Sequence, residues 1–160
     1  MSDTGATISA TTTSRINPAT LELSRPWAVA ATVIGALVPN LVIWLLGLAA
    51  GGSFEMTDAG TTSSVAPGGV VILTVVPTLI GMTLAALISL KWVAVIRPAE
   101  VIGALLPLAT IALTVQADFD TASTIALAAM HVVIAVVIVV GLEAMRRPLV
   151  GSALVRSAQV

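Results

Sequence analysis

Four long stretches of the sequence carry no formal charge, and they limit the possible fold more than any other feature. They cover residues 27–50, 69–90, 101–115 and 122–142. Because an α-helix rises about 1.5 Å per residue, about 20 apolar residues cross a hydrocarbon core of roughly 30 Å. We therefore predict a membrane-spanning helix at each stretch.

The composition excludes a soluble alternative. Hydrophobic residues make up 58% of the 160 residues and charged residues 9%, whereas soluble domains contain about 45–50% and about 25%. A soluble domain of this size needs a charged shell, and this chain has too little charge to form one. The predicted fold class is all-α: an integral membrane four-helix bundle.

The third stretch needs its flanking residues to make a full crossing, because residues 101–115 alone are short for the hydrocarbon core. Pro98 suits the first position of a helix, and Glu100 in the first turn would face the positive end of the helix dipole. The predicted spans are therefore 27–50, 69–90, 98–117 and 122–142, between a flexible cytoplasmic tail at 1–26 and a basic cytoplasmic tail at 143–160.

The first connection, residues 51–68, contains a hairpin signal. Phe54 and Met56 alternate with polar neighbours, and the Asp-Ala-Gly sequence at residues 58–60 is a turn signal before a second polar run. We expect a short β-hairpin or an extended flap here, lying on the bundle on the extracytoplasmic side.

The positions of the basic residues predict the orientation. All seven lie in the two tails or in the second connection, whereas the first and third connections contain only acidic charges. Cytoplasmic segments retain Lys and Arg, so both termini are predicted to be cytoplasmic. The seven residues are Arg15, Arg25, Lys91, Arg97, Arg146, Arg147 and Arg156.

Each span also contains a row of small or polar side chains at helical spacing. Lipid is as apolar as leucine, so helices associate in a membrane through close packing of small residues and through polar contacts. We expect these rows to face the bundle interior. The rows are Thr32, Ala36, Asn40 and Gly47; Thr74, Thr78, Gly81 and Ala85; Gly103, Pro107, Thr110 and Thr114; and Thr124, Ala128, His131 and Ala135.

Asn40 and His131 form the candidate midmembrane polar site, because the helical rise places both near the middle of the bilayer. A strongly polar side chain at this depth is unfavourable unless it faces protein or water, so it marks a functional-site hypothesis. Two interpretations remain open. One is a structural hydrogen bond between the first and fourth spans, worth about 0.6 kcal/mol; the other is a role in handling a ligand, an ion or a proton.

Pro39, Pro77 and Pro107 each fall near the middle of a span. Proline removes a backbone donor and clashes with the preceding turn, so we predict a helix kink at each position. Packing against neighbouring helices would stabilise simple kinks. The alternative is a hinge or a widened midplane cavity of the kind in which carriers hold their substrates.

Groups suited to covalent or metal chemistry are scarce. The chain has no cysteine and one histidine, and it contains no phosphate loop, nucleophile elbow or zinc-protease motif. We therefore expect no catalytic residues, no cofactor and no enzyme activity. Asp118 and Asp120 are weak candidates for a metal site, because two nearby carboxylates can share a divalent cation with backbone oxygens. The alternative is a solvated turn that caps a helix.

Four short motifs distinguish the region between residues 27 and 142. They are Asn-Leu-Val-Ile-Trp at residues 40–44, a Gly-Gly pair followed by Phe54, Ala-Asp at residues 117–118, and Leu-Ala-Ala-Met-His at residues 127–131. In these motifs the chain resembles a family of small, uncharacterised actinobacterial membrane proteins, classed as a domain of unknown function. The resemblance implies four helices in the plasma membrane, and it implies no mechanism.

We therefore predict a non-enzymatic structural or accessory membrane subunit. One alternative is a small carrier or channel-like protein that uses Asn40 and His131. Another is a membrane protein that binds a metal or a lipid headgroup through its outer loops. The expected partners are the lipid bilayer and either a second copy of the chain or another membrane protein; we expect no nucleic acid.

Overall fold

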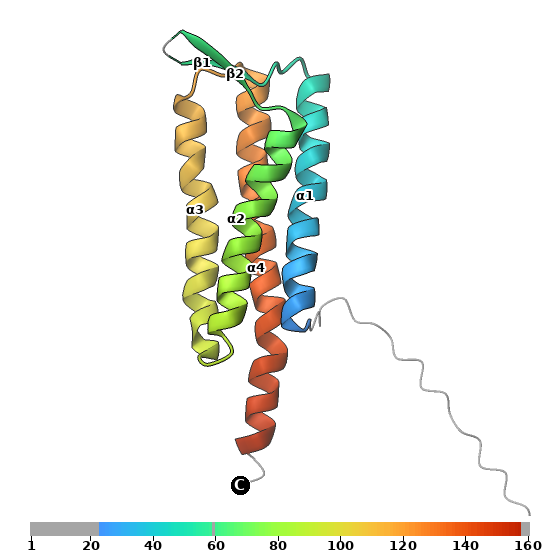
Figure 1. The fold of residues 1–160 in the computed structure, drawn as a ribbon, viewed down its shortest axis with the longest axis vertical. Helices are drawn as coiled ribbons and strands as arrows, with labels where there is room; N and C mark the ends of the chain where they lie inside the picture. Colours follow the sequence, from blue (N-terminus) through green and yellow to red (C-terminus); the bar gives the residue numbers. More distant parts are fainter. Residues whose placement is uncertain (1–22, 59, 158–160) are drawn as a thin grey trace, which may run out of the picture.

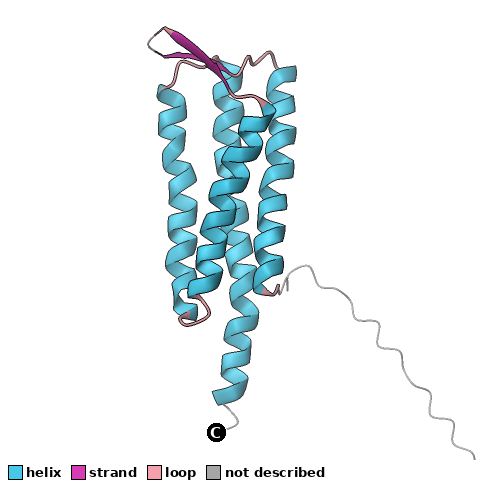
Figure 2. Cartoon of the chain, viewed as in Figure 1, coloured by secondary structure: helices cyan, strands magenta, loops and turns pink. Residues whose placement is uncertain are grey.

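The computed structural model describes residues 23–58 and 60–157, and within them it contains four long α-helices and one β-hairpin (Figures 1 and 2). All four helices are long and apolar enough to cross a membrane, so the predicted helices and the predicted hairpin are both confirmed. The elements are α1 (Arg25–Ala49), β1 (Glu55–Asp58), β2 (Thr61–Ser64), α2 (Pro67–Ile88), the 3-10 helix η2 (Val93–Val95), α3 (Ile96–Gln116) and α4 (Thr121–Ser157). The predicted flexible tail lies, up to residue 22, outside the described residues.

Three of the helices begin two residues before the predicted spans. In α1 and α2, Pro26 and Pro67 occupy the first turn, where a fixed φ and a missing donor favour helix initiation. In α3 the helix begins at Ile96, so Pro98 is not its first residue. Glu100 consequently lies in the second turn rather than the first, where it is buried and pairs with Arg97 at 3.0 Å.

α4 extends well beyond residue 142 and continues through Pro148 to Ser157. Much of the segment that we expected to be a basic tail is therefore helical, and Figure 1 shows α4 projecting past the other helices. Glu143 accepts hydrogen bonds from Arg146 and Arg147 one turn further along, a spacing that supports a helix. Arg97 of α3 also lies 3.8 Å from Glu143, which links the two helices.

The four helices run alternately up and down, so the start of α1 and the end of α4 lie at the same end of the bundle (Figure 1). We call this the tail end, and we call the opposite end, where the antiparallel β1–β2 hairpin lies, the hairpin end. α4 packs along both α1 and α3, and α1 also packs along α2.

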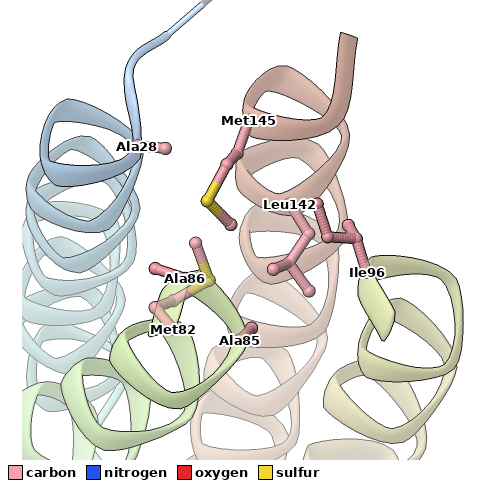
Figure 3. Packing of buried hydrophobic residues seen from close by; sticks show 7 residues of the cluster. All are labelled: Ala28, Met82, Ala85, Ala86, Ile96, Leu142 and Met145. Carbon is pink, nitrogen blue, oxygen red and sulfur yellow. The ribbon is translucent and has the colours of Figure 1, made fainter. Parts of the chain in front are cut away.

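Two hydrophobic clusters fill the bundle, one toward each end. The tail-end cluster collects side chains from all four helices, and Figure 3 shows Met145 of α4 pointing into the space between α1 and α2. The hairpin-end cluster has Phe54, from the loop before β1, at its centre. The tail-end cluster consists of Ala28, Met82, Ala85, Ala86, Ile96, Leu142 and Met145, and the hairpin-end cluster of Phe54, Val70, Ala126, Leu127 and Met130.

The small-residue row predicted for α1 lies inside the bundle. Thr32, Ala36, Asn40 and Gly47 are all buried. On the facing helix α4, a Cβ added at Gly141 would collide with the hydroxyl of Thr32. Small residues therefore allow α1 and α4 to approach closely, which is how helices associate in lipid.

The rows predicted for the other helices are only partly buried. In α2, Gly81 is exposed and Met82 takes the interior position, so the prediction for Gly81 was wrong. The row of α3 is half-covered because α3 packs mainly against one neighbour, α4. Thr74, Thr78, Ala85 and Ala135 are buried, whereas Gly103, Pro107, Thr110, Thr114, Thr124, Ala128 and His131 are half-buried.

Candidate functional site

Asn40 is a strongly polar side chain buried at mid-depth in the bundle. It lies on α1 with 1% of its surface exposed, and its Nδ2 donates a hydrogen bond to Thr74 Oγ1 on α2 at 3.0 Å. Asn40 Oδ1 and Thr78 Oγ1, also buried, have no partner among the described residues. Asn40 therefore joins α1 to α2, and not to α4 as the structural interpretation of the sequence expected.

His131 lies half-buried on α4 and bonds within its own helix. Its Nδ1 is 2.7 Å from the carbonyl oxygen of Leu127; because a carbonyl oxygen only accepts, Nδ1 carries the proton in this bond. A Cβ added at Gly35 would lie 3.4 Å from Val137 Cγ1, and one added at Gly141 would meet Thr32. These antiparallel neighbours on α1 and α4 put Asn40 close to the level of His131. The described residues nevertheless contain no hydrogen bond between the two side chains.

The three prolines lie inside α1, α2 and α3, and each helix is continuous through its proline. Pro39 and Pro77 directly precede Asn40 and Thr78, between the two hydrophobic clusters. We use the term polar layer for Asn40, Thr74, Thr78 and His131. Pro39, Pro77 and the polar layer therefore occur together at mid-depth.

Phe54 closes the hairpin end above the polar layer. Its backbone has a φ of 55°, an uncommon left-handed conformation for a residue with a side chain, and 1% of the residue is exposed. The ring packs against Trp44 with 5.8 Å between centroids, and Trp44 Nε1 donates a hydrogen bond to the carbonyl of Val65 at 2.9 Å. A Cβ at Gly47 would lie 2.6 Å from Phe54 Cζ, so Gly47 provides the space that Phe54 occupies.

Asp120 anchors the Phe54 loop to the start of α4. Its carboxylate accepts hydrogen bonds from the backbone N–H and the hydroxyl of both Ser53 and Ser123, at 2.6–3.0 Å. The Ser123 hydroxyl, followed by the backbone N–H groups of Ser123 and Ser53, holds the pKa of Asp120 well below its usual range. Ser123 Oγ also accepts the N–H of Phe54 at 2.8 Å, which completes the attachment.

This attachment bears on the metal candidates. Both oxygens of Asp120 already accept protein donors, while Asp118 is exposed. Within the described ranges, no three His, Cys, Asp or Glu side chains gather as a metal site requires. The bond from Ser123 N–H to Asp120, three residues earlier, is that of a helix N-cap, so Asp120 acts as a cap and a loop anchor.

Two grooves lie on the surface of the bundle, and neither is lined by Asn40 or His131. One, of about 1130 Å³, runs along α1 and α2 at the tail end and is bordered by Arg25. Arg25 Nε donates to Ser89 Oγ at 3.0 Å and its Nη2 to the carbonyl of Ser89 at 3.2 Å. The other, of about 460 Å³, lies beside Gly47 between α1 and α4.

Sequence reasoning identified the motifs but not their assembly. Trp44, the Gly-Gly pair, Phe54 and the Leu127–His131 motif come from three separate regions, yet the structure gathers most of them at the hairpin end. The roles of Ser53 and Ser123 were missed, as was the role of Thr74 as the partner of Asn40. One sequence signal could have indicated the roles of Ser53 and Ser123: short polar and glycine motifs occur at the ends of separate spans.

Comparison with known protein families gives one match. Residues 22–148 match the model of a family described as a family of unknown function, DUF6069. The match begins just before α1, covers the hairpin and extends into the tail-end part of α4. Searches among curated proteins and solved structures give no match.

Proposed function

The chain belongs to the DUF6069 family of unknown function, and we propose that it is a non-enzymatic structural or accessory subunit of a plasma membrane. Four helices that are long and apolar enough to cross a bilayer indicate a membrane protein. The plasma membrane and the cytoplasmic location of both termini are parts of the proposal, and they rest on the basic residues at the tail end and the cation-free loops at the hairpin end.

The observation that carries this proposal is how the polar layer is used. The amide of Asn40 holds α1 against α2, and the ring of His131 is turned onto its own backbone. The strongest polar groups at mid-depth therefore serve the bundle itself. Polar contacts of this kind hold helices together in lipid, which favours a packed structural protein.

A second observation separates this role from catalysis. Three acidic groups are engaged in the bundle: Asp120 caps α4, and Glu100 and Glu143 pair with arginines. General acid–base chemistry needs a titratable group within hydrogen-bond reach of a substrate. The bonding of these three carboxylates supports a non-enzymatic role.

Size measurement of the native complex tests the proposal. We would extract the tagged chain from its own membranes in polymer-bounded lipid discs and measure the mass of the particle. A subunit gives a discrete complex with a second membrane protein or with further copies in fixed ratio. His131→Ala should retain this complex, because among the described residues His131 bonds to its own helix. Recovery of the monomer alone would contradict the proposal.

A carrier or channel-like protein is the second candidate, because two atoms of the polar layer have no hydrogen-bond partner among the described residues. Asn40 Oδ1 and Thr78 Oγ1 are buried without partners, and buried polar atoms of this kind call for an explanation. If they belong to a transport path with His131, then His131→Ala abolishes flux in proteoliposomes while the variant stays folded. Unchanged flux in that variant eliminates the carrier.

A further inference from the structure

The tail-end groove has the shape of a site for a hydrocarbon chain. Twelve of the fifteen residues that line its volume of about 1130 Å³ have apolar side chains. Along α1 the groove extends from Arg25 to Ile34, a rise of about 14 Å. One leaflet contributes about half of a 30 Å hydrocarbon core, so the groove has the depth of a single leaflet. Val29, Val33, Leu79, Leu87, Leu90 and Leu149 form much of its wall.

Arg25 places a fixed positive charge at the open end of this groove. Two of its nitrogens are held by Ser89, whose side chain is 0% exposed and bonds in turn to the carbonyl of Ala86 at 2.7 Å. Ser89 is neutral, so these bonds orient the guanidinium without neutralising it. The described residues contain no ion pair to Arg25, whereas Arg97 and Arg146 are paired with glutamates.

The aromatic residues at this end give the depth of the groove in the membrane. Trp27 and Trp92 are each 70% exposed, and tryptophan is enriched at the level of the lipid headgroups. Lys91, which precedes Trp92 in the sequence, is also exposed. Arg25 therefore lies at the level where phosphate groups lie, and the apolar groove extends from it toward the middle of the bilayer.

From the leaflet-deep apolar groove and the guanidinium at its mouth, we propose that the groove binds an anionic phospholipid, with an acyl chain along α1 and α2 and the phosphate at Arg25. Guanidinium binds phosphate oxygens in a two-pronged geometry, and basic side chains near the surface favour anionic over zwitterionic lipid. This site lies at the tail end and is independent of the polar layer on which the proposed function rests.

Two other occupants are conceivable, and their chemistry fits less well. The first 22 residues precede Leu23 at the rim of the groove, but that sequence is mostly Thr, Ser, Ala and other small or polar residues. A second copy would bring its own Arg25 or its own apolar face, and neither supplies the negative charge that an unneutralised Arg25 attracts.

Photo-crosslinking in the full chain identifies the occupant. Thr83 is exposed and lines the groove, so we would replace it with p-benzoylphenylalanine and reconstitute the protein in equal amounts of phosphatidylglycerol and phosphatidylcholine with identical chains. Mass spectrometry after illumination should show lipid adducts enriched about fivefold in phosphatidylglycerol, the ratio expected for about 1 kcal/mol per basic side chain.

Four variants make the result specific. Arg25→Gln should reduce the enrichment to about one, Arg25→Lys should retain part of it, and Lys91→Gln should leave it unchanged, because Lys91 does not line the groove. Ala30→Trp fills the groove with Arg25 intact and should lower the yield of all lipid adducts. Ala30→Trp tests whether lipid occupies the groove even if Arg25→Gln does not fold.

Several outcomes would overturn the proposal. Crosslinks to residues 1–22 or to a second copy would show a protein occupant. Lipid adducts without headgroup preference would show ordinary surrounding lipid only. An equal loss of preference in Lys91→Gln would assign the selectivity to general surface charge, and an unchanged yield in Ala30→Trp would place the lipid elsewhere.

Discussion

The amide of Asn40 donates a hydrogen bond to the hydroxyl of Thr74, and this bond holds α1 against α2. We expect Asn40→Ala and Thr74→Ala each to destabilise the bundle, and the pair to be coupled by about 0.6 kcal/mol and at most about 1.7 kcal/mol. A double-mutant cycle from reversible unfolding in mixed micelles measures this coupling. Thr110→Ala is the matched control, because Thr110 bonds to the carbonyl of Pro107 in its own helix. Additive effects of Asn40→Ala and Thr74→Ala would disprove the contact.

Gly47 has a steric role that a second glycine lets us test. In Gly47→Ala the new methyl group would lie 2.6 Å from Phe54 Cζ and 2.9 Å from Ala126 Cβ, so Phe54 has to move. We expect a loss of about 1–3 kcal/mol, typical of overpacking. Gly81→Ala in α2 meets no atom within 4 Å, and it should be neutral or slightly stabilising. Thermal unfolding of the two variants compares them directly, and equal midpoints would show that Phe54 does not need the space.

For single residues, the sequence predicted burial better than it predicted hydrogen-bond partners. Asn40 was expected in the interior from its depth and from the row at helical spacing, and it is buried. Its partner depends on how each helix is rotated about its axis, and spacing alone does not determine that rotation. Gly81 shows the same limit, since a shift of one position along α2 places Met82 inside and Gly81 outside.

Among the elements, the hairpin depends on Asp120 for its attachment, and this dependence predicts a pH effect. The hydrogen bonds of Ser123 and Ser53 lower the pKa of Asp120 in the folded protein below its ordinary value, which is about 3.9 in unfolded chains. A lowered pKa stabilises the fold at pH values above the unfolded pKa, and this contribution decreases as the pH falls toward the folded pKa. The stability advantage of wild type over Asp120→Asn should therefore be constant from pH 7 to about 5 and shrink below about 4.

Unfolding midpoints of the two proteins across that pH range measure the effect. Asp118→Asn is the control, because Asp118 is exposed and its carboxylate forms no hydrogen bond in the part of the chain that the structure describes. An advantage that stayed the same down to pH 3, or one that Asp118→Asn removed equally, would assign the pH response to another group.

The element boundaries show what local sequence signals determine. The prolines at the start of α1 and α2 mark helix initiation, whereas the predicted spans began two residues later, at Trp27 and Gly69. The length of α4 was missed because of its charged residues. Charged residues usually end a hydrophobic span, but here Arg146 and Arg147 each bond to Glu143 along the helix, and the helix continues beyond the apolar segment.

For the whole molecule, the central expectation is that the hairpin end faces outward. Single cysteines at Ser63, which is exposed in β2, and at Ser152, near the end of α4, test it in a chain that has no cysteine of its own. An impermeant thiol reagent applied to intact cells should label Ser63→Cys and leave Ser152→Cys unlabelled until the membrane is opened. Labelling of the second position, or protection of the first, would reverse the orientation.

The overall architecture was accessible from the sequence because the bilayer removes most alternatives. Within hydrocarbon, the backbone has to satisfy its hydrogen bonds locally, so four uncharged segments of sufficient length imply four helices. The sequence could not predict which helices pack against each other. α4 contacts both α1 and α3, and the sequence does not determine how each helix is rotated about its axis. The anchoring of the loop by Asp120 was also hidden, because it joins residues 67 positions apart.

The separation between Ser53 and Asp120 has a consequence for how the protein is made. Asp120 and Ser123, which hold the loop between α1 and α2, are translated after both of those helices. We therefore expect the loop to stay undocked until α4 has formed. An undocked loop on a stalled or truncated product would be open to surface proteases, so this late contact distinguishes finished molecules from unfinished ones.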